Sequence, residues 1–253
     1  MIKVVILGGG NLAFHLTNTM LKTSSINLVQ VYNRSLSKIK YLKGKTLITN
    51  NIDELKDADI YIVSVSDNAI SELTSKLVLK NKLVVHTSGA ANITELQSNS
   101  RKGVFYPLQS FSKEKEINFK EVPFCLETEN KLDFKLLKKI STLLGSNSYN
   151  INSEQRKKLH VAAVFVNNFV NHLYYLGNEI CDENNIPFEI LKPLIKETSN
   201  KIIDLQPFDA QTGPAIRKDS KTINKHLELL NENQQKIYSI LTKSIIETYG
   251  KKL

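Results

Sequence analysis

The chain has 253 residues, of which 41% are hydrophobic, so it can form one large or two modest domains with proper cores. Its formal net charge of +9, from 34 Lys and Arg against 25 Asp and Glu, would suit an anionic partner. No basic run is interleaved with aromatic residues, so we do not expect a nucleic-acid partner. No apolar run reaches the ~20 residues of a membrane span. The two cysteines, Cys125 and Cys181, are isolated, so neither a metal site nor a disulfide framework is expected.

The start of the chain runs from Met1 almost directly into an apolar strand and a glycine turn. This pattern leaves no room for a cleavable leader, so we expect a soluble cytoplasmic protein.

Short β-branched runs alternate with helical patterns through the first 150 residues. The predicted strands are 3–7, 27–33, 46–50, 59–66, 82–90 and 103–109, and a helix is predicted over 11–23. Strands buried on both faces and separated by helices indicate a parallel sheet of βαβ units. Because the crossovers are right-handed, the sheet is doubly wound. We therefore predict an α/β fold with a Rossmann-type dinucleotide-binding domain over residues 1–151.

The first turn of this domain has the sequence GGGNLA, a GxGxxA pattern between a predicted strand and a predicted helix. Gly8 permits a tight turn, Gly10 lets the backbone approach a pyrophosphate, and Ala13 is small enough for close packing of helix on sheet. Asn11 and Leu12 begin the helix, whose free N–H groups and dipole favour a phosphate. The alternative is a glycine turn without a ligand.

The second strand ends in Asn33, Arg34 and Ser35, with Lys38 one turn later. NAD-binding sites usually place an Asp or Glu here to bind the ribose hydroxyls, and none is present. Arg34 can pair with a 2′-phosphate and lie against the adenine, so the predicted cofactor is NADP(H). The alternative for Arg34 is an ordinary exposed arginine.

The fourth and fifth predicted strands end in small polar residues. Ligands of open α/β sheets bind outside the carboxyl ends of the strands, so the candidates for the nicotinamide end are Ser64, Val65, Ser66, Thr87 and Ser88. Ser66 or Asp67 could equally cap the following helix. Tyr106, at the end of the next strand, is a candidate for substrate binding or for packing.

From about Asn152 the pattern changes to helices alone, predicted over 159–178, 187–205 and 226–253, so we predict an all-helical domain over 152–253. At about 100° per residue, polar residues of the first helix form one stripe on an apolar helix: His160, Asn167, Asn171 and Asn178.

The stripe is a candidate for catalysis in a cleft between the two domains. His160 could donate a proton, Asn167 and Asn171 could orient a carbonyl or carboxylate, and Asn168 could bind substrate. The alternative is a buried helical spine or a dimer interface in which these groups bond to neighbouring protein.

A second candidate lies between the last two predicted helices. Thr212 and Gly213 precede Pro214 as in a turn entering a helix, whose N–H groups, with Arg217, could bind an anionic substrate group. The alternative is a surface pair of Arg217 with Asp219 beside a capped helix.

The motifs GGGNLA, YNRS and VSVSDNAI, followed by helices, resemble the 6-phosphogluconate and hydroxyisobutyrate dehydrogenases, pyrroline-5-carboxylate reductases and deazaflavin-dependent NADP oxidoreductases. A closer resemblance rests on HTSGA, YPLQSF, EQRKKLHVAAVFVNNFVNHL and TGPAIRKD. It is to a bacterial family with a Rossmann-like NADP-oxidoreductase domain and a C-terminal helical domain of unknown function. The resemblance implies this fold, NADP(H) as cofactor and a homodimer.

One residue departs from the wider group. Its hydroxyacid dehydrogenases carry a catalytic lysine three residues before an Asn pair, and Val164 stands at that place here. Plain 3-hydroxyacid chemistry is therefore not expected. From the nucleotide-binding domain and the polar stripe we expect an NADP(H)-dependent oxidoreductase that reduces a small carbonyl or imine metabolite. The alternatives are a non-catalytic NADP(H)-binding sensor or scaffold and hydride exchange with a deazaflavin.

Overall fold

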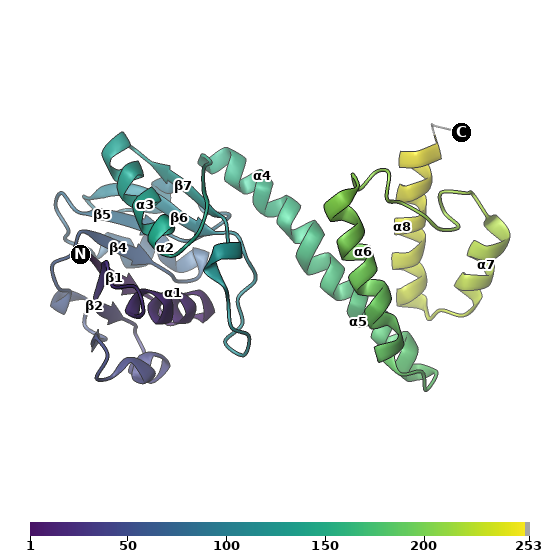
Figure 1. The fold of residues 1–253 in the computed structure, drawn as a ribbon, viewed down its shortest axis with the longest axis horizontal. Helices are drawn as coiled ribbons and strands as arrows, with labels where there is room; N and C mark the ends of the chain where they lie inside the picture. Colours follow the sequence, from purple (N-terminus) through teal and green to yellow (C-terminus); the bar gives the residue numbers. More distant parts are fainter. Residues whose placement is uncertain (251–253) are drawn as a thin grey trace. The chain divides into compact units, whose positions relative to one another are not determined.

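The computed structural model describes residues 1–250. The chain divides into two compact units, Met1–Asn167 and Asn168–Leu253 (Figure 1). Helical structure without further strands begins with α4 (Ser153–Ala163), and the first turns of this helix pack within the N-terminal unit. The predicted boundary after residue 151 lies just before α4.

The N-terminal unit is built on one sheet, which has eight strands within the described residues. Their order is β3-β2-β1-β4-β5-β6-β7-β8. The first six, in order 3-2-1-4-5-6, are parallel and form the doubly wound arrangement that the sequence predicts. The strands are β1 (Ile2–Leu7), β2 (Ile26–Tyr32), β3 (Leu47–Thr49), β4 (Ile60–Val63), β5 (Leu83–His86), β6 (Arg101–Pro107), β7 (Phe124–Thr128) and β8 (Ser148–Asn150).

Helices cover both faces of this sheet. Alternate strand residues such as Val4 and Ile6 pack with α1 (Asn11–Leu21) and α3 (Lys131–Leu143), while Val5 and Leu7 pack on the opposite face with α2 (Ile70–Ser75). Figure 1 shows α1 and α3 beside the strands. Because both faces are covered, β4 and β5 are buried along their whole length.

Strands β7 and β8 are absent from the prediction. β7 pairs antiparallel with β6, so that Tyr106 lies opposite Cys125 and Val104 opposite Glu127. Phe124 of β7 packs on Phe105 with ring centroids 4.3 Å apart. Both missed strands are short and lack a β-branched run, so their pairing comes from the sheet edge rather than from local preference.

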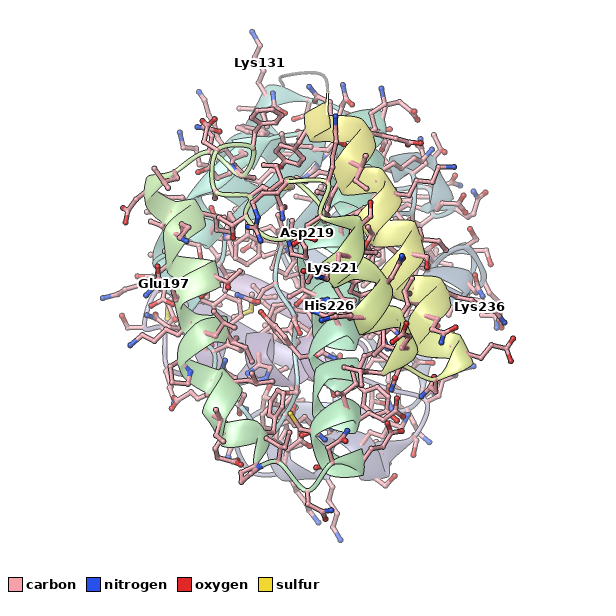
Figure 2. The ribbon with its side chains drawn as sticks, turned by 90° about the vertical axis from the view of Figure 1, so that its right-hand side faces the viewer. Lys131, Glu197, Asp219, Lys221, His226 and Lys236 are labelled. Atoms are coloured by element: carbon pink, nitrogen blue, oxygen red, sulfur yellow. The ribbon has the colours of Figure 1, made fainter. Side chains whose placement is uncertain are left out.

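The C-terminal unit is helical throughout its described elements, which are α5 (Val170–Glu183), α6 (Lys192–Asp204), α7 (Ser220–Glu228) and α8 (Glu232–Tyr249). The sequence predicts one helix over 226–253, and for the described residues this prediction is wrong. Helix α7 ends at Glu228, and Asn231 caps the start of a separate helix, α8, in a capping box with Gln234. Residues 251–253 lie outside the described part. In Figure 2, Lys221 and His226 extend from α7 and Lys236 from α8.

A π-helical segment, Val164–Phe169, joins α4 to α5. It contains Asn167 and Asn168. It begins at Val164, the residue that stands where the hydroxyacid dehydrogenases have their catalytic lysine. A π turn has a different number of residues per turn from an α-helix, so the stripe computed at 100° per residue is wrong across this segment. Such turns in α-helices are frequent at functional sites.

Among residues 1–250, no helix is long and apolar enough to cross a membrane.

Candidate active site

A groove with a volume of about 490 Å³ lies at the carboxyl ends of β1, β2, β4 and β5. Ten of the twelve predicted cofactor residues line it: Gly8, Gly10, Asn11, Leu12, Asn33, Arg34, Val65, Ser66, Thr87 and Ser88. The remaining two, Ala13 and Ser35, are not in its lining. Ala13 belongs to α1 and is buried in the core, and the backbone carbonyl of Ser35 accepts a hydrogen bond from Asn33 Nδ2 at 2.8 Å.

The glycine turn has the two properties that the sequence predicts. Gly8 has φ +144°, and a Cβ there would overlap the backbone carbonyl of Ser64. Its N–H donates to the carbonyl of Tyr32 at 2.8 Å, so the turn is held between β2 and β4. At Gly10 a Cβ would meet no protein atom within 4 Å, which leaves the backbone open to the groove. An extended phosphate-containing ligand fits this cradle.

Basic side chains gather along one part of the groove. Arg34, Lys38 and Lys76 line it together with Glu72. Lys76 Nζ pairs with Glu72 Oε1 at 2.8 Å, and this hydrogen bond is the largest cause of a lowered pKa of Glu72. Since Glu72 is already paired with Lys76, Arg34 and Lys38 are the cations best placed for an anionic group.

Several lining residues, chiefly those of the first turns after β4, were not predicted from the sequence. They are Tyr32, Ile52, Asp67, Ala69, Glu72, Leu73 and Lys76, together with Gly9. Asp67 and Ala69 belong to a 3₁₀ turn that precedes α2. In open sheets the residues that follow a strand face the ligand. Applying this rule to one further helical turn after each strand would have found them. Ser66 occupies the N-cap of this 3₁₀ turn without a capping hydrogen bond from its side chain.

The turn after β5 is held by internal hydrogen bonds. His86 Nδ1 accepts from the N–H of Ser88 at 3.1 Å, and Ser88 Oγ accepts from the N–H groups of Ala90 and Ala91. Burial, followed by the nearby charge of Arg156, lowers the pKa of His86 to about 4. His86 is therefore neutral at physiological pH and acts here as an acceptor that fixes the turn.

Tyr106 and His160 form a pair next to this turn. The hydroxyl of Tyr106, on β6, lies 3.1 Å from His160 Nδ1, on α4. A Cβ on Gly89 would lie 2.6 Å from His160 Nδ1 and 2.8 Å from Tyr106 Cζ. The absence of a side chain at Gly89 therefore lets both rings lie close to the backbone of this turn. Thr87 and Ser88 line the groove, and the pair contacts Gly89, the next residue along the chain.

The phenol of Tyr106 is protonated at physiological pH. Burial raises its pKa to about 12, with a further increase from Cys125 that the charge of Arg156 opposes. A protonated phenol hydrogen-bonded to an imidazole can act as a general acid.

The other candidate residues belong to later segments of the chain. Asn167 is in the π-helical segment, while Asn168, Asn171, Thr212 and Arg217 belong to the C-terminal unit. The predicted helix entry at Pro214 is wrong: residues 214–218 form a turn, and α7 begins only after Asp219, which caps it by accepting from the N–H of Thr222 at 3.0 Å. The N–H groups expected beside Arg217 are therefore not those of a helix N-terminus, and the role of Arg217 stays a prediction.

Both parts of this chain are similar to known protein families. Residues 3–89 match the family described as coenzyme F420-dependent NADP oxidoreductase, and residues 122–245 match a domain of unknown function, DUF2520. A candidate NADP oxidoreductase from Bacteroides fragilis is 40% identical, with a TM-score of 0.89, over 97% of this chain and 98% of that one.

The chain belongs to this NADP oxidoreductase family. The resemblance expected from the sequence, the Rossmann fold and NADP(H) as the cofactor are thereby confirmed. No curated protein sequence matches the chain.

Two more distant structures share the fold. A protein from Thermotoga maritima is 22% identical, with a TM-score of 0.75, over 98% of both chains. An imine reductase from Myxococcus stipitatus, in complex with NADP⁺, is 15% identical, with a TM-score of 0.68, over 99% of this chain and 95% of that one.

The two glycines of the first turn give a matched test of the groove. Gly8→Ala should destabilise the protein by roughly 3 kcal/mol, because its Cβ overlaps the Ser64 carbonyl. Gly10→Ala should leave the free energy of unfolding within about 0.5 kcal/mol of wild type. It should nevertheless weaken NADPH binding at least about tenfold, because the new methyl group points into open groove. Denaturant unfolding and NADPH fluorescence titration measure the two effects. Unchanged NADPH affinity in Gly10→Ala would contradict the assignment of this turn to the pyrophosphate.

Proposed function

We propose that this protein is an NADPH-dependent reductase of a small carbonyl or imine, in which Tyr106 donates the proton and His160 assists it. The observation that carries this proposal is the Tyr106–His160 pair against Gly89, directly beyond the groove-lining residues Thr87 and Ser88. The hydrogen bond between the two side chains lies within the N-terminal unit.

In this reaction NADPH, when bound, supplies a hydride to the carbon of the C=O or C=N bond. Tyr106 donates its phenolic proton to the oxygen or nitrogen, which gains the electron pair of the π bond. His160 Nδ1–H then donates a hydrogen bond to the phenolate oxygen and stabilises the charge left there. A proton from solvent restores the phenol. A lysine at the position of Val164 is not needed, because the proposed proton donor, Tyr106, is on strand β6.

The high pKa of Tyr106 suits reduction better than oxidation. A phenol with a pKa of about 12 holds its proton throughout the physiological range and delivers it only to a stronger base. The alkoxide or amide nitrogen that forms during hydride transfer is such a base. In the reverse direction the same pair would have to begin as phenolate, which burial disfavours.

For the cofactor, we propose that Gly10, Asn11 and Leu12 bind the pyrophosphate and that Arg34 binds the 2′-phosphate, with Lys38 beside it. Asn33, Val65, Ser66, Thr87 and Ser88 then line the path towards the nicotinamide. The positions of these residues in the groove and the absence of an Asp or Glu at the end of β2 support this assignment.

Arg34→Ala tests the 2′-phosphate assignment. Loss of a charge-assisted hydrogen bond, worth about 1.5–3 kcal/mol, should weaken NADPH binding roughly 10- to 100-fold and leave NADH binding unchanged. The measurement is fluorescence titration with both nucleotides. Lys45→Ala, an exposed residue outside the groove lining, is the control and should have no effect. An equal loss for NADPH and NADH would contradict the assignment.

Tyr106→Phe tests the proton donor. It should lower kcat for a reduced carbonyl or imine roughly 10²- to 10³-fold, because general acids contribute about this much, while NADPH affinity stays unchanged. His160→Gln should lower kcat less, and Gly89→Ala should lower it by forcing the pair apart. Steady-state kinetics over a panel of small ketones and cyclic imines measure this, with Tyr149→Phe on β8 as control.

The same panel separates the alternatives. Full activity of Tyr106→Phe would overturn the proposed proton donor. Tight NADPH binding without turnover of any panel member would instead favour the NADP(H) sensor, and turnover only with a deazaflavin would favour hydride exchange with that cofactor.

We also propose that a second copy of the chain covers the C-terminal unit. Among its described residues, Leu176, Cys181, Ala215 and Gln234 alone are buried, too few for a helical unit of this length to have its own core. Large apolar side chains lie on its surface instead. Leu194 is 62% exposed, Ile203 79% and Ile240 69%. Apolar area of this extent is typical of an obligate homodimer interface.

Size-exclusion chromatography with light scattering tests the dimer. The wild-type chain should have the mass of two chains, and Leu194→Glu with Ile203→Glu should dissociate it, because two carboxylates would be desolvated in the interface. Leu132→Glu, equally exposed on α3 of the N-terminal unit, should leave the dimer intact. A monomeric wild-type protein would contradict the proposal.

Asn167, Asn168, Asn171, Thr212 and Arg217 stay predictions as catalytic or substrate contacts. The cytoplasmic location and the lack of a nucleic-acid partner also stay predictions.

A further inference from the structure

Arg156 is a charged residue with no exposed surface, four residues before His160 on α4. Its Nη1 donates to Glu127 Oε2 at 2.5 Å, and its Nη2 donates to the carbonyl of Ala91 at 2.5 Å and to Ser153 Oγ at 3.1 Å. The guanidinium thus joins three segments: α4, strand β7 and the loop after β5.

Ser153 strengthens the same attachment at the first turn of α4. Its hydroxyl donates to Glu127 Oε2 at 2.8 Å and accepts from the N–H of Ile93 at 3.1 Å. One carboxylate oxygen of Glu127 therefore accepts from both Ser153 and Arg156. The start of α4 is fixed by directional bonds to the sheet and to the loop that carries Gly89.

The sheet register relates this attachment to the Tyr106–His160 pair. Tyr106 lies opposite Cys125, and Val104 opposite Glu127, so Cys125 and Glu127 face the same side of the sheet. On α4, Arg156 and His160 are four residues apart and share a face. Arg156 and His160 therefore each join α4 to the sheet, Arg156 through Glu127 and His160 through Tyr106.

The ion pair joins Arg156, which has no exposed surface, to Glu127, whose side chain is 16% exposed, and such a pair is not required for stability alone. Removing charges from water is costly, and well-packed apolar residues often replace a buried pair without loss. Apolar contacts, however, are not directional and allow a helix to shift along its axis. Hydrogen bonds from one planar guanidinium to Glu127 and Ala91 allow a single position.

We propose that Arg156 is a positioning residue, whose hydrogen bonds to Glu127 and Ala91 set α4 along its axis so that His160 Nδ1 meets the hydroxyl of Tyr106. The importance of this contact for turnover rests on the proposed function. The dependence of the Tyr106–His160 contact on Arg156 is a geometric statement that holds whether or not the proposed function is right.

The test compares Arg156→Met, Arg156→Lys and the double variant Glu127→Leu with Arg156→Met in the full chain. The readout is the side-chain NMR signal of His160, assigned by its loss in His160→Gln, and recorded where circular dichroism shows each variant to be folded. Lys157→Met, which removes an exposed pair with Glu154, is the matched control and should leave the signal unchanged.

Arg156→Met should lower the melting temperature, because Glu127 loses its cationic partner, and the double variant should recover much of it. In both variants the His160 signal should shift to that seen in Tyr106→Phe, in which the contact cannot form. A double variant with recovered melting temperature and a wild-type His160 signal would overturn the proposal, because the pair would then be structural only. If stability is not recovered, Arg156→Lys decides. It keeps the charge and loses the planar fork, so a wild-type His160 signal there would also overturn the proposal.

Kinetics separate this inference from the proposed function. If both are right, the double variant lowers kcat by roughly 100-fold, as expected for a misplaced catalytic group, while the KM for NADPH is unchanged. If Tyr106→Phe retains full activity but the His160 signal shifts in the Arg156 variants, the proposed function fails and the positioning role of Arg156 stands.

Discussion

The turn after β1 passes directly over the end of β4, and this contact is possible only because Gly8 has no side chain. Its φ of +144° directs the chain into α1, and its N–H bonds to the end of β2. The contact holds the end of β1 against the ends of β2 and β4, where Arg34 and Ser66 line the groove. The shape of the groove at this end of the sheet depends on that backbone approach.

A second close approach extends the site. Gly89 lets Tyr106 and His160 lie against the turn after β5, while His86 and Ser88 hold that turn from within. The neutral state of His86 matters here, because its Nδ1 must stay free to accept the Ser88 N–H. Burial therefore has opposite effects on the two pKa values: it lowers that of His86, which stays neutral with one ring nitrogen free to accept, and raises that of Tyr106, which keeps its phenolic proton.

Polar groups of α4 meet the sheet at a place where Arg156 and Ser153 are buried and Glu127 is only 16% exposed. Arg156, Glu127 and Ser153 share hydrogen bonds, and the charge of Arg156 also acts on Cys125 and Tyr106. In surroundings of low polarity each of these groups needs its partner. A single arrangement of α4 on β6 and β7 is consistent with all of these bonds.

The sequence by itself determined the parallel core of the sheet, the glycine turn, the choice of NADP(H) and most of the groove lining. These features follow from local patterns: β-branched runs, glycine spacing and the residues at strand ends. Tertiary structure alone decided the antiparallel strand β7, the π-helical segment and the meeting of Tyr106 with His160. These two residues are 54 positions apart, and their contact depends on strand register and on the placement of α4. Local preference cannot specify such a contact, because packing and paired buried charges fix it only when the whole unit has formed.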